Sequence, residues 1–195
     1  MRYWHPFTED TVKAVKAWTP DEIVLLPLYP QFSTTTTASS QRVWNDTARK
    51  VGLTAPSRFI CCYPDEPGFV TALVDITKQA IATAVMEAPN KAQMIIFSAH
   101  GLPQKIVDKG DPYVQQVEAT VAATVAQLGL ARDQWIIAYQ SRVGPLQWVG
   151  PSTDEVITEN AKAGRAIIVV PVAFVSEHSE TLVELDIEYR HLALS

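Results

Sequence analysis

The chain has 195 residues, of which 47% are hydrophobic and 19% are charged, so it can bury a core in one domain or two small ones. Its formal charge of −5, its pI near 5.3 and its lack of Lys or Arg runs argue against a nucleic-acid-binding surface. The expected ligands are therefore neutral, cationic or small.

Five apolar runs rich in β-branched residues alternate with helical segments along the chain. They lie at residues 23–29, 58–63, 94–99, 135–141 and 166–175. Strands that alternate with helices predict parallel βαβ units with right-handed crossovers. The sequence therefore predicts an α/β fold with parallel sheets flanked by helices.

Two helices carry the clearest start and stop signals. Residues 111–129 open with Asp-Pro and close at a glycine, and residues 152–164 open with a capping box formed by Ser152 and Glu155. The polar stretch "STTTTASS" at residues 33–40 is interpreted as the entry to another helix rather than as a linker.

A break at "MEAPNKAQ" is expected to separate two α/β units, residues 1–87 and residues 88–195. The longest apolar run, "AIIVVPVAFV", is too short to cross a bilayer, so no transmembrane helix is expected. The start has no apolar signal-peptide segment, which predicts a cytoplasmic protein and leaves peripheral membrane contact open.

Cys61 and Cys62 are the two cysteines of the chain. Adjacent residues of a strand point to opposite faces, so a disulfide between them is not expected, and their spacing does not fit a metal knuckle. Burial as small apolar side chains is the preferred interpretation.

Polar turns follow four of the predicted strands. In an open α/β sheet, ligands bind beyond the carboxyl ends of the strands. The side chains expected to gather on that edge are His100, Arg142, Trp148, His178 and Glu180.

Glu180, Glu184 and Glu188 recur every fourth residue after the last strand, and like charges at that spacing on a helix repel. On an α-helix they form a stripe bordered by apolar residues, which fits a polar cleft or a metal path better than a solvated face. The alternative is that Glu177 and Glu180 complement the helix dipole behind a Ser176 cap, but this does not account for Glu188.

Five sequence blocks resemble the signature blocks of the ferrochelatases, in the order of that family. They are "RYWHP", "LPLYPQFS", "FSAHGLP" with "KGDPY", "YQSRVGP" followed by a tryptophan, and "PVAFVSEHSETLVELDIEY". The resemblance implies two Rossmann-like lobes with porphyrin held between them, and an enzyme that inserts ferrous iron into protoporphyrin IX to form protohaem. By this resemblance, residues 1–87 are a partial first lobe and residues 88–195 are the second lobe.

The resemblance also implies roles for individual residues. His100 and Glu180 match the family's catalytic histidine and glutamate, and the expected metal ligands are His100, Glu180, Glu184 and Glu188. Neutral imidazole can accept a pyrrole proton or bind metal, and carboxylates can bind a hard ion or relay a proton. The positions expected to contact the porphyrin are Arg2, Tyr3, Tyr29, Trp148 and His178.

Several structural alternatives stay open. His100 could be a strand-end histidine bonded to a loop, Trp148 and Tyr29 could be core aromatics, and Arg142 could pair with a nearby acid. His178 could serve only as a donor that orients its neighbours.

Fe²⁺ is expected as substrate, with Zn²⁺ accepted in its place because N/O ligands select weakly among divalent ions. No tightly bound cofactor is expected, and the sequence shows no cysteine cluster for an iron–sulfur centre. Compared with the family, the chain begins inside the first lobe and stops after "DIEY". We therefore expect these 195 residues to insert metal poorly and to self-associate through an open sheet edge. The alternatives are a non-catalytic porphyrin-binding fragment, or a chelatase acting on coproporphyrin or sirohydrochlorin.

Overall fold

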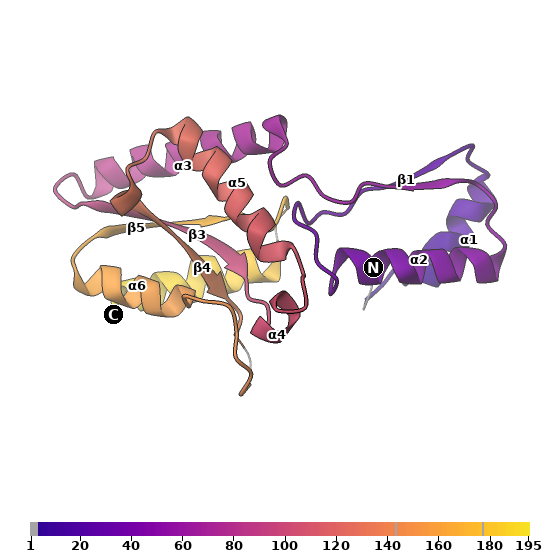
Figure 1. Cartoon of the computed structure of the whole chain (residues 1–195). Helices are drawn as coiled ribbons and strands as arrows, with labels where there is room; N and C mark the ends of the chain where they lie inside the picture. Colours follow the sequence, from indigo (N-terminus) through magenta and orange to yellow (C-terminus); the bar gives the residue numbers. More distant parts are fainter. Residues whose placement is uncertain (1–3, 143, 177) are drawn as a thin grey trace. The chain divides into compact units, whose positions relative to one another are not determined.

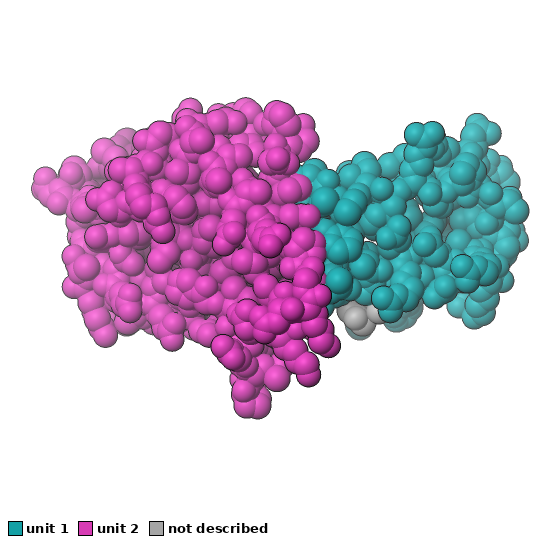
Figure 2. Space-filling view, in the orientation of Figure 1, with its two compact units in different colours: residues 1–63 teal, residues 64–195 magenta. Residues whose placement is uncertain are grey.

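The computed structural model describes residues 4–142, 144–176 and 178–195. Its contacts divide the chain into two compact units, residues 1–63 and residues 64–195, which Figure 2 shows in different colours. Each unit contains a parallel sheet and helices, so the predicted α/β class is confirmed.

The first unit is built from two helices and two short parallel strands. In chain order these are α1 (Thr8–Trp18), β1 (Ile23–Leu25), α2 (Thr37–Val51) and β2 (Ser57–Phe59). Its core is small and contains Val12, Ile23 and Trp44. The predicted helix entry at residues 33–40 is confirmed, because α2 begins within it.

The second unit contains a three-stranded parallel sheet with the strand order β4-β3-β5. Its elements are α3 (Pro67–Glu87), β3 (Gln93–His100), α4 (Gln104–Val107), α5 (Tyr113–Leu128), the 3₁₀ turn η1 (Arg132–Gln134), β4 (Trp135–Gln140), α6 (Thr153–Lys162), β5 (Ala166–Pro171), η2 (Glu180–Glu188) and α7 (Tyr189–Leu194). Figure 1 shows α3 and α5 on one side of this sheet and α6 on the other.

The period-two alternation of the central strand β3 explains these two layers. Ile95 and Phe97 belong to the core cluster that includes residues of α3 and α5. Met94 and Ile96 belong to the opposite cluster, which includes residues of α6 and α7. Because both faces are covered by helices, β3 is a continuous apolar run.

The structure confirms the two helices with the clearest signals and corrects one capping detail. Asp111 accepts a hydrogen bond of 3.0 Å from the N–H of Tyr113, and Gly129 ends α5 in the left-handed conformation. Ser152 is the N-cap of α6, but within the described residues its side chain makes no capping hydrogen bond, so the predicted capping box is wrong. The backbone just before Ser152 pairs with β4, since the Tyr139 N–H donates to the Pro151 carbonyl.

The boundary between the two compact units differs from the predicted one because of helix α3. Leu73 of α3 packs in the core cluster of the second unit, so the compact units divide after Tyr63 and not at residue 87. The assignment of residues 1–87 and 88–195 to family lobes stays a prediction.

Among the described residues, α3 is also the one helix long and apolar enough to cross a membrane. The sequence expectation missed it because Asp75 and Lys78 interrupt its apolar run. Length and composition do not distinguish a span from an amphipathic core helix, and 22% of its most apolar window is buried.

The expected burial of the cysteines is wrong, because Cys61 is exposed and Cys62 is half-buried. Neither cysteine is in a disulfide, as predicted, and their sulfur atoms lie 3.4 Å apart.

Candidate functional site

The residues His100 and Glu180 meet at the carboxyl end of the central strand. His100 is the last residue of β3, and Glu180 is the first residue of η2, which follows the edge strand β5. The His100 Nδ1 lies 2.9 Å from Glu180 Oε2, with both side chains partly buried. Residues 80 positions apart therefore form the pair that the strand-end rule predicted.

The contact between His100 and Glu180 changes the pKa of each side chain in the direction that favours its ionised form. The hydrogen bond that His100 donates to Glu180 raises the pKa of His100 above its ordinary value, burial opposes this, and the charges of Glu180 and Glu184 add to the rise. Burial would raise the pKa of Glu180, but His100, His178 and Gln140 together lower it. Glu180 is therefore a carboxylate that can only accept, so the neutral imidazole donates from Nδ1 and keeps its lone pair on Nε2.

A buried polar chain holds Glu180 from the strand side. Gln140, the last residue of β4, donates from Nε2 to Glu180 Oε2 at 3.3 Å. Its Oε1 accepts a 2.6 Å hydrogen bond from Ser98 of β3, and Ser98 lies 3.4 Å from the Thr153 hydroxyl of α6. Because Gln140, Ser98 and Thr153 are buried and bonded together, they fix the position of the carboxylate.

The turn after His100 packs closely on β4. Gly101 N–H donates to the Gln140 carbonyl at 2.8 Å, and a Cβ at Gly101 would lie 2.7 Å from that oxygen, which no side chain permits. The same Cβ would meet the ring of Trp148 at 3.3 Å, so this tryptophan lies beside the catalytic candidate. Tyr113, the first residue of α5, is buried in the same core cluster as Leu102, and burial raises the pKa of its hydroxyl.

Ser141, the residue that follows β4, holds the Glu184 carboxylate in place. Ser141 donates to its carboxylate from both the backbone N–H (3.1 Å) and the hydroxyl (2.7 Å), and the Tyr189 hydroxyl donates at 3.1 Å. Ser141 has φ of 61°, a left-handed conformation that a serine rarely adopts. Strain of this kind is typical of functional sites.

The helix that carries the acids is a π-helix, Glu180–Glu188, and not the predicted α-helix. The Tyr189 N–H donates to the Glu184 carbonyl five residues back, which is the bond that defines this wider turn. The helix begins at Glu180 and its N-cap is Ser179, so the Ser176 cap is wrong; Glu177 lies outside the described residues. Such π segments occur frequently at functional sites.

His178 supports the start of this helix. Its Nδ1 accepts from the Glu180 backbone N–H at 3.3 Å, and its ring stacks on Phe174 at a centroid distance of 4.9 Å. His178 therefore orients its neighbours as the alternative predicted, but this ring nitrogen accepts rather than donates; its contact with porphyrin stays a prediction. Arg142 pairs with Glu155 of α6 at 3.8 Å, which matches its structural alternative.

The remaining predicted site residues are Arg2, Tyr3, Tyr29 and Glu188. Arg2 and Tyr3 lie outside the described residues. Tyr29 belongs to the first unit, where it is 40% exposed and lines a cavity of about 250 Å³. Glu188 is exposed, and the described residues contain no group of three or more metal-ligating side chains. The predicted metal path over Glu184 and Glu188 therefore stays a prediction.

The comparison with known proteins agrees with the sequence blocks. A family model described as ferrochelatase matches residues 1–195. The chain belongs to the ferrochelatase family. It is 49% identical to a ferrochelatase of Pelagibacter ubique and 51% identical to one of Phenylobacterium zucineum, each over 193 residues, 99% of this chain and 54% of the relative. A ferrochelatase of Rickettsia bellii is 48% identical over 99% of this chain and 52% of the relative. The chain thus spans about half the length of the curated relatives it matches.

Sequence reasoning missed the residues that support this candidate site. Ser98, Gln140 and Ser141 form hydrogen bonds that position the two glutamates. Their one sequence signal is that polar residues end two otherwise apolar strands, which by itself is typical of any loop entry.

The contacts of Glu184 and Glu188 predict different effects on stability when each residue is replaced by glutamine. Glu184→Gln is expected to lower the free energy of unfolding by about 1–3 kcal/mol, because Ser141 then loses a charged acceptor. The exposed Glu188→Gln is the matched control and is expected to change it by less than about 0.5 kcal/mol. Urea denaturation of both variants measures the difference, and equal effects would contradict the role of the Ser141 contact.

Proposed function

We propose that this chain carries the metal-insertion chemistry of a ferrochelatase and places ferrous iron in protoporphyrin IX to form protohaem, a lyase reaction. The observation that supports this proposal is the His100–Glu180 pair, 2.9 Å apart at the carboxyl end of the central strand.

Insertion of a divalent ion requires the loss of two pyrrole protons. His100 Nε2 accepts a proton from a pyrrole N–H, and the imidazolium that forms is stabilised by the Glu180 carboxylate on its Nδ1 side. His100 then returns this proton to solvent and accepts the second pyrrole proton, so both protons have left the ring when the metal is bound by all its nitrogens. The carboxylates of Glu180 and Glu184 supply oxygen ligands suited to a hard divalent ion on its way to the ring.

The porphyrin requires apolar and aromatic surface beside this base. Trp148 lies against the turn after His100, and its face suits a flat macrocycle. Tyr29, Arg2 and Tyr3 remain proposed ring contacts, and arginine suits the propionates. Zn²⁺ is proposed to replace Fe²⁺, and cytoplasmic location stays a prediction from the sequence.

One titration tests the proposal with the chain itself. Protoporphyrin IX is added to the protein and its binding is followed by fluorescence; Zn²⁺ is then added, and the conversion of the free-base spectrum to the zinc-porphyrin spectrum is timed. A rate above that of a protein-free control in the same solution supports metal insertion. Binding without an increased rate would favour the non-catalytic porphyrin-binding alternative, and the same assay with coproporphyrin or sirohydrochlorin tests the other chelatases.

A further inference from the structure

The side chains that meet Glu180 project from one face of the sheet. His100 of β3 is in register with Gln140 of β4, and Ser98 lies two residues before His100, so the three side chains share a face. Helix α6 covers this face, because Ala138, two residues before Gln140, belongs to the core cluster that includes residues of α6. The alternation of the two strands therefore brings their polar ends together beside the start of η2.

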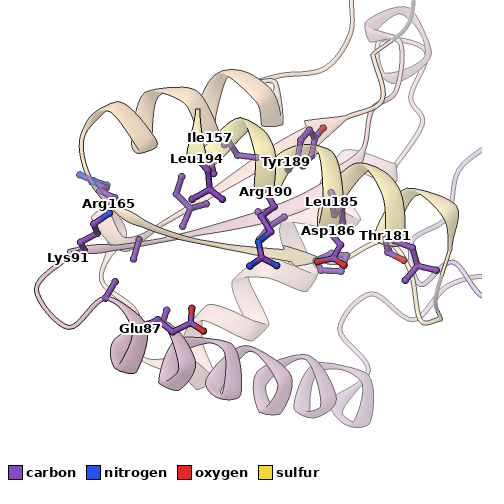
Figure 3. A pocket seen from close by; sticks show the side chains of 18 residues that line it. Glu87, Lys91, Ile157, Arg165, Thr181, Leu185, Asp186, Tyr189, Arg190 and Leu194 are labelled. Atoms are coloured by element: carbon purple, nitrogen blue, oxygen red, sulfur yellow. The ribbon is translucent and has the colours of Figure 1, made fainter.

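The helix that carries Glu180 is held on this face by apolar contacts. Tyr189, the residue after η2, is buried in the core cluster that contains Ile157 of α6 (Figure 3). Leu185 of η2 packs against the same cluster. These contacts are internal to the second unit, so its core sets the place of the Glu180 backbone.

The chemistry of the hydrogen bonds gives the buried polar chain one direction. A carboxylate can only accept, so the Gln140 atom that faces Glu180 is the amide Nε2, and the other end of the amide is an acceptor. Ser98 therefore donates its one hydroxyl proton to Gln140 Oε1, at 2.6 Å. Since that proton is used, the threonine is the donor in the 3.4 Å contact between Thr153 and Ser98. The chain of donors runs from Thr153 through Ser98 and Gln140 to the charge on Glu180.

Burial fixes this orientation of the amide. Ser98, Gln140 and Thr153 are each 1% exposed or less, so solvent does not replace a lost partner. A reversed Gln140 amide would set its oxygen against the Glu180 carboxylate and leave a buried acceptor without a donor. The amide is therefore held in the orientation that donates to Glu180.

One oxygen of Glu180 accepts from both of its partners. Gln140 Nε2 lies 3.3 Å from Oε2, and His100 Nδ1 lies 2.9 Å from the same atom. Two donors occupy the two lone pairs of Oε2, whereas Oε1 lies toward His178, 3.9 Å from its Nδ1. A divalent ion that approaches Glu180 would meet Oε1, so the Gln140 contact acts on the base and not on the metal.

From this geometry we propose that Gln140 is a positioning residue for metal insertion. Held by Ser98, its amide keeps Glu180 Oε2 on the Nδ1 side of His100, so that Nε2 stays the atom that accepts a pyrrole proton. The proposal rests on the proposed function. Because Gln140 is buried, it acts through Glu180 and not by contact with the substrates.

Gln140→Met keeps the approximate length of the side chain and removes the donor. Its kcat for zinc insertion into protoporphyrin IX is expected to fall by about tenfold to a hundredfold, the usual contribution of a hydrogen bond to a charged group. The KM for Zn²⁺ is expected to stay within about twofold, because Oε1 is unchanged. Ser98→Ala leaves the amide unheld and is expected to lower kcat by about tenfold.

A double variant tests the order of the chain. Because Ser98 acts through Gln140, the kcat of Ser98→Ala combined with Gln140→Met is expected to equal that of Gln140→Met alone. The matched control is Ser152→Ala, the same substitution at a buried serine that makes no capping hydrogen bond among the described residues, and its kcat is expected to be unchanged. Thermal melts establish that each variant is folded, and Ser98→Ala carries the test if Gln140→Met is not.

The ring of His100 supplies a readout that does not depend on metal insertion. Above the pKa of His100, ¹⁵N NMR of the original chain is expected to show a neutral ring with its proton on Nδ1. This signal is assigned among the four histidines by its loss in His100→Ala. In Gln140→Met and Ser98→Ala, the form with the proton on Nε2 is expected to gain population. The same change in a chain that inserts no metal would mean that the proposed function fails while Gln140 still orients the pair.

Two results would overturn the proposal. One is a kcat of Gln140→Met within about twofold of the original, together with an unchanged ring spectrum. The other is a pair of losses that multiply in the double variant, since Ser98 would then act independently of Gln140.

Discussion

Replacing His100 with alanine is expected to lower the rate of metal insertion by about 10²–10⁴-fold, the usual contribution of a positioned general base. The imidazole ends β3 and lies 2.9 Å from Glu180, so it can accept a pyrrole proton while the carboxylate stabilises the charge. Binding of protoporphyrin IX is expected to stay within a few fold, because alanine removes a proton acceptor and leaves Trp148 against the turn. Fluorescence measures binding, and the zinc-porphyrin spectrum measures insertion.

A matched substitution separates this role from a general loss of imidazole. His191 is exposed on α7, so His191→Ala is expected to retain the original rate and stability. Near-original turnover in His100→Ala would show that another group accepts the proton. A parallel loss of porphyrin binding and of thermal stability would instead indicate that His100 is a structural strand-end residue.

Composition and pattern predicted much of the second unit. Apolar β-branched runs predicted β3, β4 and β5 because a parallel sheet buried on both faces needs continuous apolar strands. The parallel direction then placed their carboxyl ends together, which is why His100 and Glu180 could be paired before the structure was known.

The residues that orient the pair could not be predicted because their roles depend on distance in space. Gln140 and Ser98 are polar residues at strand ends, and only the register of β3 and β4 brings them into contact with each other. The π-helix was missed for a related reason, since acids four residues apart fit the pattern of an α-helix as well. Glu184 of this π-helix also contacts Ser141, 43 positions away, and a local sequence pattern cannot predict such a contact.

Tertiary packing also overrode two local signals. The sequence breaks near Pro89 and Asn90, but the compact units divide after Tyr63 because α3 buries Val70 and Leu73 with the second unit. The preference of free cysteine for burial did not hold for Cys61, which follows a strand of only three residues in a small unit.

The His100–Glu180 pair further predicts how activity and stability depend on pH. The pKa of His100 is raised, so the neutral base forms only as the pH rises through a value above its ordinary 6.5. The rate of insertion is therefore expected to increase across that pH. For stability the sign is opposite: the contribution of His100 is present below pH 6.5 and is lost as the pH rises through its folded-state pKa. The contribution of Glu180, whose pKa is lowered, is lost as the pH falls through its own folded-state pKa.

Glu180→Gln should change both profiles, because it keeps the shape of the side chain and removes its charge. Without the carboxylate the pKa of His100 falls toward its ordinary value, so the acid limb of the rate profile moves to lower pH. The plateau is expected to fall by about 10²-fold, since the imidazolium formed during proton transfer is no longer compensated. The loss of thermal stability relative to the original chain is expected to be largest between about pH 4.5 and 6.5, where both groups are charged. Zinc insertion and melting curves measured across this range, with Glu159→Gln on the exposed face of α6 as control, distinguish the charge pair from a packing role. An acid limb that stays in place after Glu180→Gln would mean that the proton acceptor is not the imidazole held by Glu180.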